Sequence, residues 1–98
     1  MNPIESGYQF ILITYDIRDD RRREKLAKLL LSYGDRVQYS VYECLVTQAQ
    51  LETIHCKSGE ILAEEDSLRF YPLCRSCRTK IETTDCPPVT EHPACILI

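Results

Sequence analysis

The clearest hydrophobic pattern along the chain is a short apolar run from Phe10 to Ile17. Seven of its eight residues are apolar, aromatic or β-branched, which is typical of a buried central strand and too short for a helix with a polar face. Because side chains alternate across a strand, Leu12, Thr14 and Asp16 are expected on one face. A carboxylate on that mostly apolar face costs free energy unless it is paired or coordinates a metal. Asp16 is therefore the first candidate site residue.

A helix is predicted next, from a cap at Asp19 or Asp20 to about residue 33. Its apolar positions follow the i, i+3, i+4, i+7 spacing of a core-facing stripe, formed by Leu26, Leu29, Leu30 and Tyr33. Gly34 is a natural stop signal for this helix. Beyond it, residues 37–46 are rich in β-branched and aromatic side chains and predict one strand.

A second helix is predicted from residue 47 to about residue 63. It begins with the capping-box pair Thr47 and Gln50, and a break at Gly59 is possible because glycine costs about 1 kcal/mol inside a helix. His55 is expected to pack at the core edge rather than to bind a ligand. Three further strands are predicted over residues 67–73, 80–84 and 94–98.

The order of these elements predicts a ferredoxin-like α+β fold of the βαββαβ type, an antiparallel sheet with two helices on one face. Residues 1–98 are expected to form a single domain, with a core at about 8–84 and a tail at 85–98. The other sheet face would be bare, and a twofold homodimer is the commonest way to cover it. The apolar tail could add an extra strand to a sheet edge, in its own chain or in a partner.

Composition narrows the class of protein. The apolar fraction of 44% and the charged fraction of 28% are ordinary for a globular protein. No apolar run approaches the roughly 20 residues that span a membrane, and no basic signal-peptide region opens the chain. A cytoplasmic protein without a membrane partner is therefore expected, and its six cysteines favour free thiols or a metal over disulfides.

The net charge of -3 conceals an uneven distribution. The segment from Arg18 to Arg36 carries seven basic and four acidic residues, whereas the rest of the chain carries five basic and eleven acidic ones. A basic segment on an acidic protein could face phosphates. It could equally be a solvated helix face with mixed ion pairs, and the charge count alone does not separate these interpretations.

The cysteines suggest a second kind of site. Cys74 and Cys77 have the spacing of half a zinc site, and the other ligands could be Cys86 with either His92 or Cys95. Free thiols are the alternative. A redox-active pair is disfavoured, because such a pair is expected where a strand leads into a helix, and here another strand is predicted to follow.

Asp16 can be interpreted in two ways from its pattern. It could cap a helix or pair with a neighbouring arginine, or it could bind Mg²⁺, which takes one or two protein carboxylates and keeps its waters. A twofold axis nearby would bring two copies of Asp16 together, and a metal held there could position water against a phosphodiester. One chain offers no larger set of carboxylates for a self-sufficient nuclease site.

Four segments of the chain resemble the CRISPR-associated Cas2 family, over roughly residues 8–74. They are residues 12–17, the basic helix start at 21–23, the segment 33–43 with its Gln-Tyr-Ser-Val-Tyr string, and residues 67–73. The resemblance implies a ferredoxin-like homodimer in which the aspartate that ends the first strand faces its symmetry mate and binds Mg²⁺. In this chain that residue is Asp16.

The resemblance also implies the remaining site residues. Tyr15, Ser40 and Tyr42 would shape a catalytic site around Asp16, and Arg23 and Arg36 would contact nucleic-acid phosphates. Arg18 and Arg22, in the same basic segment, are further candidates for such contacts. Two activities compete: a metal-dependent endonuclease acting on RNA or DNA, and a non-catalytic adaptor that bridges two CRISPR integrase dimers and holds protospacer DNA during spacer acquisition. One carboxylate per chain favours the adaptor on chemical grounds. A zinc-binding regulatory module is a remoter third possibility.

Overall fold

The sheet and helices lie within residues 7–82, the part of the chain that this computed structural model describes. Along that stretch the elements are β1 (Tyr8–Asp16), α1 (Asp20–Leu31), β2 (Gly34–Gln38), β3 (Val41–Thr47), α2 (Gln48–Ile61), β4 (Ser67–Leu73) and α3 (Arg75–Arg78). No helix in this stretch is long and apolar enough to cross a membrane.

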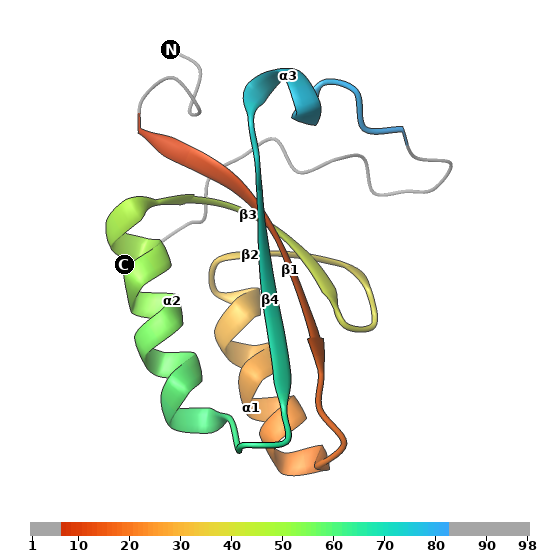
Figure 1. Cartoon of the computed structure of the whole chain (residues 1–98), viewed down its shortest axis with the longest axis vertical. Coiled ribbons are helices and arrows are strands. Elements are labelled where there is room, and N and C mark those ends of the chain that lie inside the picture. Colours follow the sequence, from red (N-terminus) through yellow and green to blue (C-terminus); the bar gives the residue numbers. More distant parts are fainter. Residues whose placement is uncertain (1–6, 83–98) are drawn as a thin grey trace.

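Strand β1, which contains the apolar run, lies inside the sheet between β3 and β4. The strand order is β2-β3-β1-β4, and each neighbouring pair is antiparallel. Asp16, at the end of β1, lies opposite Ser67 at the start of β4, and Phe10 lies opposite Leu73 at its end. Helices α1 and α2 cover the same face of the sheet (Figure 1). This is the ferredoxin-like arrangement that the element order predicted.

The core lies between that sheet face and the two helices. Ile11, Ile13 and Tyr15 of β1 are buried there, against Leu26 of α1 and Ile54 of α2. On the opposite face Leu12 and Thr14 are half-buried and Asp16 is exposed. The predicted alternation of β1 is confirmed, and it places the Asp16 carboxylate on the face that the helices leave bare.

The single strand predicted over residues 37–46 is wrong. The chain instead forms a hairpin, in which β2 ends at Gln38, Tyr39 and Ser40 form the turn, and β3 begins at Val41. The Tyr15 amide donates to the Ser40 carbonyl across 3.2 Å and fixes this turn against β1. The sequence signal was missed because the turn contains no glycine, proline or asparagine.

Glycine matters at the start of the hairpin rather than at its turn. A Cβ on Gly34 would collide with the carbonyl oxygen of Glu43 and the sulfur of Cys44, and would lie 2.9 Å from the Cys44 Cα. Only glycine lets β2 approach β3 so closely. Gly34 therefore begins a strand, where the sequence suggested only the end of a helix.

The predicted helix starts are confirmed. Asp19 caps α1 by accepting from the Arg22 amide at 2.9 Å, and Thr47 and Gln50 form the reciprocal capping box of α2. Helix α2 continues through Gly59 without the break considered above. The His55 ring lies against Phe70 of β4 in a tilted arrangement with centroids 4.1 Å apart. The residue is otherwise exposed, so it borders the core from outside.

The predicted strand at 80–84 is wrong for residues 80–82. The chain after β4 turns into α3, and the Lys80 and Ile81 amides donate to the carbonyls of Cys77 and Arg78. These i to i+3 bonds continue a helical turn and leave no extended segment to join the sheet. Residues 83–84, the tail at 85–98 and the predicted strand at 94–98 lie outside the described residues.

Candidate functional site

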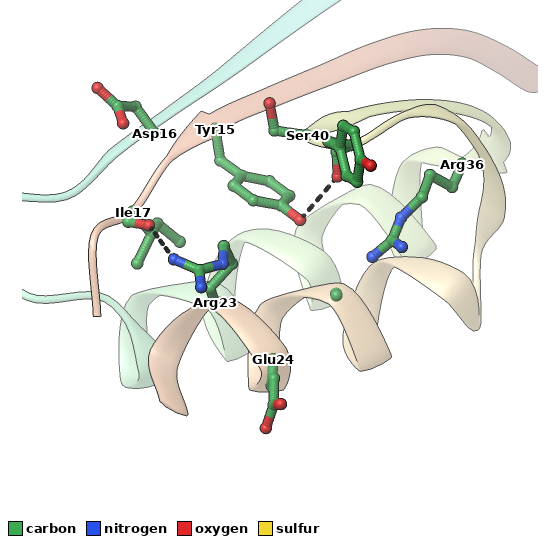
Figure 2. Close-up of a pocket in the computed structure, with 9 residues that line it drawn as sticks. Tyr15, Asp16, Ile17, Arg23, Glu24, Arg36 and Ser40 are labelled. Carbon is green, nitrogen blue, oxygen red and sulfur yellow. Dashed lines mark hydrogen bonds between the residues drawn. The ribbon is translucent and has the colours of Figure 1, made fainter. Parts of the chain in front are cut away.

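A pocket of about 480 Å³ lies where β1 ends (Figure 2). Its walls come from β1, from α1 and from the β2–β3 hairpin, and its lining residues are Tyr15, Asp16, Ile17, Arg23, Glu24, Ala27, Arg36, Tyr39 and Ser40. Five residues predicted from separate stretches of the sequence thus meet in one place: Tyr15, Asp16, Arg23, Arg36 and Ser40.

Tyr15 lines the pocket, and Tyr42 lies buried behind it and positions one arginine. Tyr42 is fully buried and its ring stacks on Tyr15, with centroids 6.1 Å apart. The Nε of Arg36 donates to the Tyr42 hydroxyl at 2.9 Å, and this hydrogen bond raises the pKa of Arg36. The acceptor is a hydroxyl and not a carboxylate, so this contact places no carboxylate against the guanidinium. Tyr42 therefore orients Arg36 and does not itself reach the pocket.

Tyr15 connects β1 to the hairpin turn. Its hydroxyl donates to the Tyr39 carbonyl at 3.3 Å (Figure 2), while its amide holds Ser40. Burial raises the pKa of Tyr15, and the Tyr42 hydrogen bond raises it further. At neutral pH the phenol is therefore protonated and acts as a hydrogen-bond donor. The predicted role of Tyr15 and Ser40 in shaping the site agrees with this geometry.

Arg23 lies on the other side of the pocket. One of its terminal nitrogens donates to the Ile17 carbonyl at 2.9 Å and to the Arg18 carbonyl at 3.3 Å, and the other contacts the exposed carboxylate of Asp20. Figure 2 shows Arg23 and Arg36 on opposite sides of the Tyr15 ring. The pocket thus carries two guanidinium groups, one held by the segment that follows β1 and the other by the hairpin.

Asp16 points the other way from Tyr15, away from the helices (Figure 2). This follows from strand alternation, which places successive side chains on opposite faces. Asp16 also borders a smaller pocket of about 230 Å³, together with Arg18, Glu65 and Asp66. The carboxylate is therefore exposed between the arginine pocket and the bare sheet face.

Arg22 has a different environment from Arg23. Its Nε donates to Asp66 at 2.7 Å and one terminal nitrogen donates to Glu65 at 3.1 Å. The Asp66 side chain is only 1% exposed and also accepts from the Ala63 amide at 2.8 Å. The Arg22 hydrogen bond lowers the pKa of Asp66. Arg22 therefore fastens α1 to the turn before β4, and its predicted phosphate contact stays a prediction.

The donors around Asp16 suit a hard cation only in part. Mg²⁺ accepts one or two carboxylates and completes its shell with water, and the exposed Asp16 can supply one. Glu65 and Asp66 border the same small pocket, but both contact Arg22. Within residues 7–82, no three His, Cys, Asp or Glu side chains form a metal cluster. The described part of the chain thus supplies one available carboxylate, and the candidate zinc ligands Cys86, His92 and Cys95 lie outside it.

Sequence reasoning missed three features of the site. Tyr39 and Glu24 line the pocket, and Asp66 neutralises Arg22. The signal for Asp66 was present, because the acidic turn at residues 64–66 could have been matched with the basic helix start. The signal for Tyr39 was hidden, because its position depends on a hairpin turn that the sequence presented as strand.

A ferredoxin-like sheet with a carboxylate at the end of its central strand, beside two buttressed arginines, defines a small protein suited to contact phosphates. The sequence profile described as CRISPR associated protein Cas2 matches residues 9–81. This chain therefore belongs to the Cas2 family of CRISPR-associated proteins, as its motifs indicated.

Individual relatives agree with this assignment. A Synechocystis protein named CRISPR-associated endoribonuclease Cas2 3 is 44% identical over 88 residues, which cover 89% of this chain and 96% of that protein. A Thermus thermophilus protein named CRISPR-associated endonuclease Cas2 2 is 46% identical over 68 residues, covering 68% of this chain and 76% of the relative. One chain of a partial Cas6-RT-Cas1–Cas2 complex matches with a TM-score of 0.71 at 32% identity, covering 92% of this chain and 99% of that one.

Proposed function

We propose that this protein binds the phosphate backbone of nucleic acid in the pocket beside β1, and that it acts with the CRISPR integrase in spacer acquisition. The observation that carries the proposal is the pair Arg23 and Arg36, which project into one pocket and are held by carbonyl and phenol oxygens. Backbone contacts from arginine position nucleic acid without reading its sequence. The complex that joins a related chain to Cas1 supports the integrase as partner.

The first proposed activity is metal-dependent hydrolysis of a phosphodiester in RNA or DNA. Asp16 would hold Mg²⁺, and the bound ion would supply the Lewis acidity that phosphodiester hydrolysis requires. Arg23 and Arg36 would hold the phosphate on one side of the strand end, and Tyr15 would keep the hairpin wall in place. The nuclease names carried by two relatives support this activity.

A homodimer is part of this proposal, because a single chain offers one carboxylate. Asp16 faces the side of the sheet that α1 and α2 leave bare. On that face Leu12 and Val41 are half-buried and Tyr71 is 42% exposed. A second copy packed there about a twofold axis would cover this apolar surface and could bring a second Asp16 to the same ion.

The second candidate is an adaptor that binds protospacer DNA between integrase dimers without cutting it. Glu65 and Asp66 favour this candidate, since the carboxylates that share a pocket with Asp16 already contact Arg22. A nuclease would be expected to keep such carboxylates available for metal. The arginine pocket serves either activity.

The decisive experiment compares cleavage of labelled single-stranded RNA, single-stranded DNA and duplex DNA by the wild type and by Asp16→Ala, with Mg²⁺ or with EDTA. The matched control is Glu52→Gln, an exposed carboxylate at the start of α2, near the opposite end of β1. A nuclease should cut only with Mg²⁺, lose at least 100-fold in rate with Asp16→Ala, and be unaffected by Glu52→Gln.

Spacer acquisition in cells, measured with the same variants, separates the two candidates. An adaptor should leave all three substrates intact while Asp16→Ala still supports acquisition. Failure of the wild type to bind any of the nucleic acids, measured by fluorescence anisotropy, would contradict both candidates.

A further inference from the structure

The Cys74–Cys77 pair occupies a position that the sequence did not predict. Cys74 directly follows β4 and is the N-cap residue of α3, and Cys77 lies one helical turn later. The sequence argument against a redox pair assumed that a strand follows these cysteines. The chain turns into a helix there instead, so the pair lies at a strand-to-helix junction, where redox-active CxxC pairs are expected.

The two thiols are exposed and interact with each other. The Cys74 sulfur lies 3.3 Å from the Ser76 hydroxyl, in the first turn of α3. The Ser76 hydroxyl, followed by the Cys77 donors, lowers the pKa of Cys74 to about 7, whereas the bond to Cys74 raises the pKa of Cys77. Both thiols are thus exposed at the junction of β4 and α3, one helical turn apart, which is the arrangement that a thiol pair needs to exchange with a small disulfide.

The other cysteines of the described residues provide a contrast. Cys44 is fully buried in β3, and burial raises its pKa to about 12, which makes it unreactive. Cys56 is exposed on α2, but the sequence gives it no neighbouring cysteine within a helical turn. Only Cys74 and Cys77, among residues 7–82, combine exposure with a second cysteine one helical turn away.

We propose that Cys74 and Cys77 form a thiol–disulfide exchange site that is oxidised by low-molecular-weight disulfides of the glutathione class. The Cys74 thiolate attacks one sulfur of the small disulfide, breaks its S–S bond and releases the first small thiol. Cys77 then loses its proton and attacks the Cys74 sulfur of the mixed disulfide, which releases the second small thiol. The protein dithiol loses two electrons and two protons, and the small disulfide gains them as two thiols.

Closing this bond would affect the far end of the sheet from Asp16. β4 starts opposite Asp16 and ends opposite Phe10, and α3 follows that end (Figure 1). Next to Cys77, the guanidinium carbon of Arg78 lies 5.2 Å from the centroid of the Phe10 ring. A four-residue helix is marginal by itself, so a covalent link across its first turn would hold Arg78 against Phe10. The site does not depend on the nucleic-acid pocket.

The test uses the reduced full-length protein and oxidised glutathione at neutral pH, followed by blocking of free thiols and digestion with trypsin. Trypsin cuts after Arg69, Arg75 and Arg78, so Cys74 and Cys77 fall in separate peptides. The expected product is the 70–75 peptide linked to the 76–78 peptide, with a loss of two hydrogens. Dithiothreitol should reverse it.

Three variants sharpen the test. Cys77→Ser should stop at a mixed disulfide between glutathione and Cys74, and Cys56→Ser should form the linked pair as the wild type does. In Cys77→Ser, Cys74 should react about threefold faster at pH 7 than an ordinary exposed thiol, since a larger fraction is thiolate although each thiolate is less nucleophilic. In Cys74→Ser, Cys77 should react more slowly than Cys74 does.

Three results would overturn the proposal. The first is a linked peptide that joins Cys74 or Cys77 to Cys86 or Cys95. The second is reaction of Cys56 at the same rate as Cys74. The third is stoichiometric zinc in the purified protein that is lost with Cys74→Ser, because the thiols would then be metal ligands.

Discussion

The arginines beside the two pockets that border Asp16 have different hydrogen-bond partners. In the larger pocket, Arg36 is held by the neutral Tyr42 hydroxyl, and Arg23 is held by two carbonyls and a largely exposed carboxylate. Beside the smaller pocket, Arg22 is bound by the carboxylates of Glu65 and Asp66. The contrast leads us to expect that Arg36 and Arg23 can pair with a phosphate more readily than Arg22, whose charge is already balanced by two carboxylates.

This distinction separates residues that the sequence places side by side. Arg22 and Arg23 are adjacent in a basic run, yet one acts within the fold and the other faces the pocket. Arg36, which belongs to no basic run, has the more favourable environment of the three because its positioning partner carries no charge. A count of neighbouring basic residues would have placed Arg36 below both Arg22 and Arg23.

The strongest test of the comparison is Arg36→Ala against Arg22→Ala. Loss of Arg36 should raise the dissociation constant for a labelled single-stranded oligonucleotide roughly 10- to 150-fold, the worth of a hydrogen bond to a charged group. It should also reduce the slope of log affinity against log salt by about 1. Arg22→Ala should change affinity less than about twofold. Fluorescence anisotropy at several salt concentrations measures both quantities.

Tyr42→Phe is the matched control for the positioning of Arg36. It keeps the buried ring and its stack on Tyr15 but removes the hydroxyl that accepts from Arg36. Affinity should fall by roughly 2- to 10-fold, as for a neutral hydrogen bond, and the salt slope should stay unchanged because the charge remains. Equal losses in Arg22→Ala and Arg36→Ala would refute the comparison.

For thermal stability we expect Arg22→Ala to have a larger effect than Arg36→Ala. Arg22→Ala removes the charged donor from Asp66, whose side chain is buried, so the midpoint of thermal unfolding should fall by several degrees. Arg21→Ala, at an exposed neighbouring position, should leave the midpoint nearly unchanged. Arg36→Ala removes one hydrogen bond to a hydroxyl and should lower the midpoint less than Arg22→Ala does. Circular dichroism melts would contradict this if Arg21→Ala and Arg22→Ala were equally stable.

The smallest effect concerns pH. Because the pKa of Asp66 is lower in the folded protein than its ordinary value of 3.8, ionised Asp66 favours folding. That stabilisation is fully present above the ordinary pKa and is lost as the pH falls through the folded value. The difference in melting temperature between wild type and Asp66→Asn should therefore be constant from about pH 7 to about pH 5 and shrink near pH 3. A difference that persists at the lowest pH would show that Asp66 acts through packing.

Much of the fold was predictable because its signals are local. The apolar run of β1, the stripe on α1 and the caps at Asp19 and Thr47 each depend on residues within a few positions of one another. The hairpin was not predictable in this way. Its turn is fixed by Tyr15, which lies 24 residues before Tyr39 and donates to its carbonyl, and its close pairing requires Gly34 beside Cys44.

The candidate site likewise contains residues that local sequence signals identified and residues whose environment depends on distant partners. The sequence singled out Asp16 through its position at the end of an apolar strand, and family motifs supplied Tyr15, Arg23, Arg36, Ser40 and Tyr42. Arg22 was also predicted to contact phosphates, although its side chain binds Asp66, 44 residues further along the chain. The redox interpretation of Cys74 was set aside for a related reason, since the strand expected after it proved to be the helical turn of α3.

By itself, the sequence determined the order of the main elements and the sheet face on which Asp16 lies, because alternation, periodicity and capping act over a few residues. It also showed that several arginines follow Asp16 closely in the chain. Only the tertiary structure decided which arginines keep their charge available, where the hairpin turns and which thiols meet. Those outcomes depend on partners far apart in the chain, and the free energy of a charged or reactive group is set by the groups that folding places within hydrogen-bonding distance.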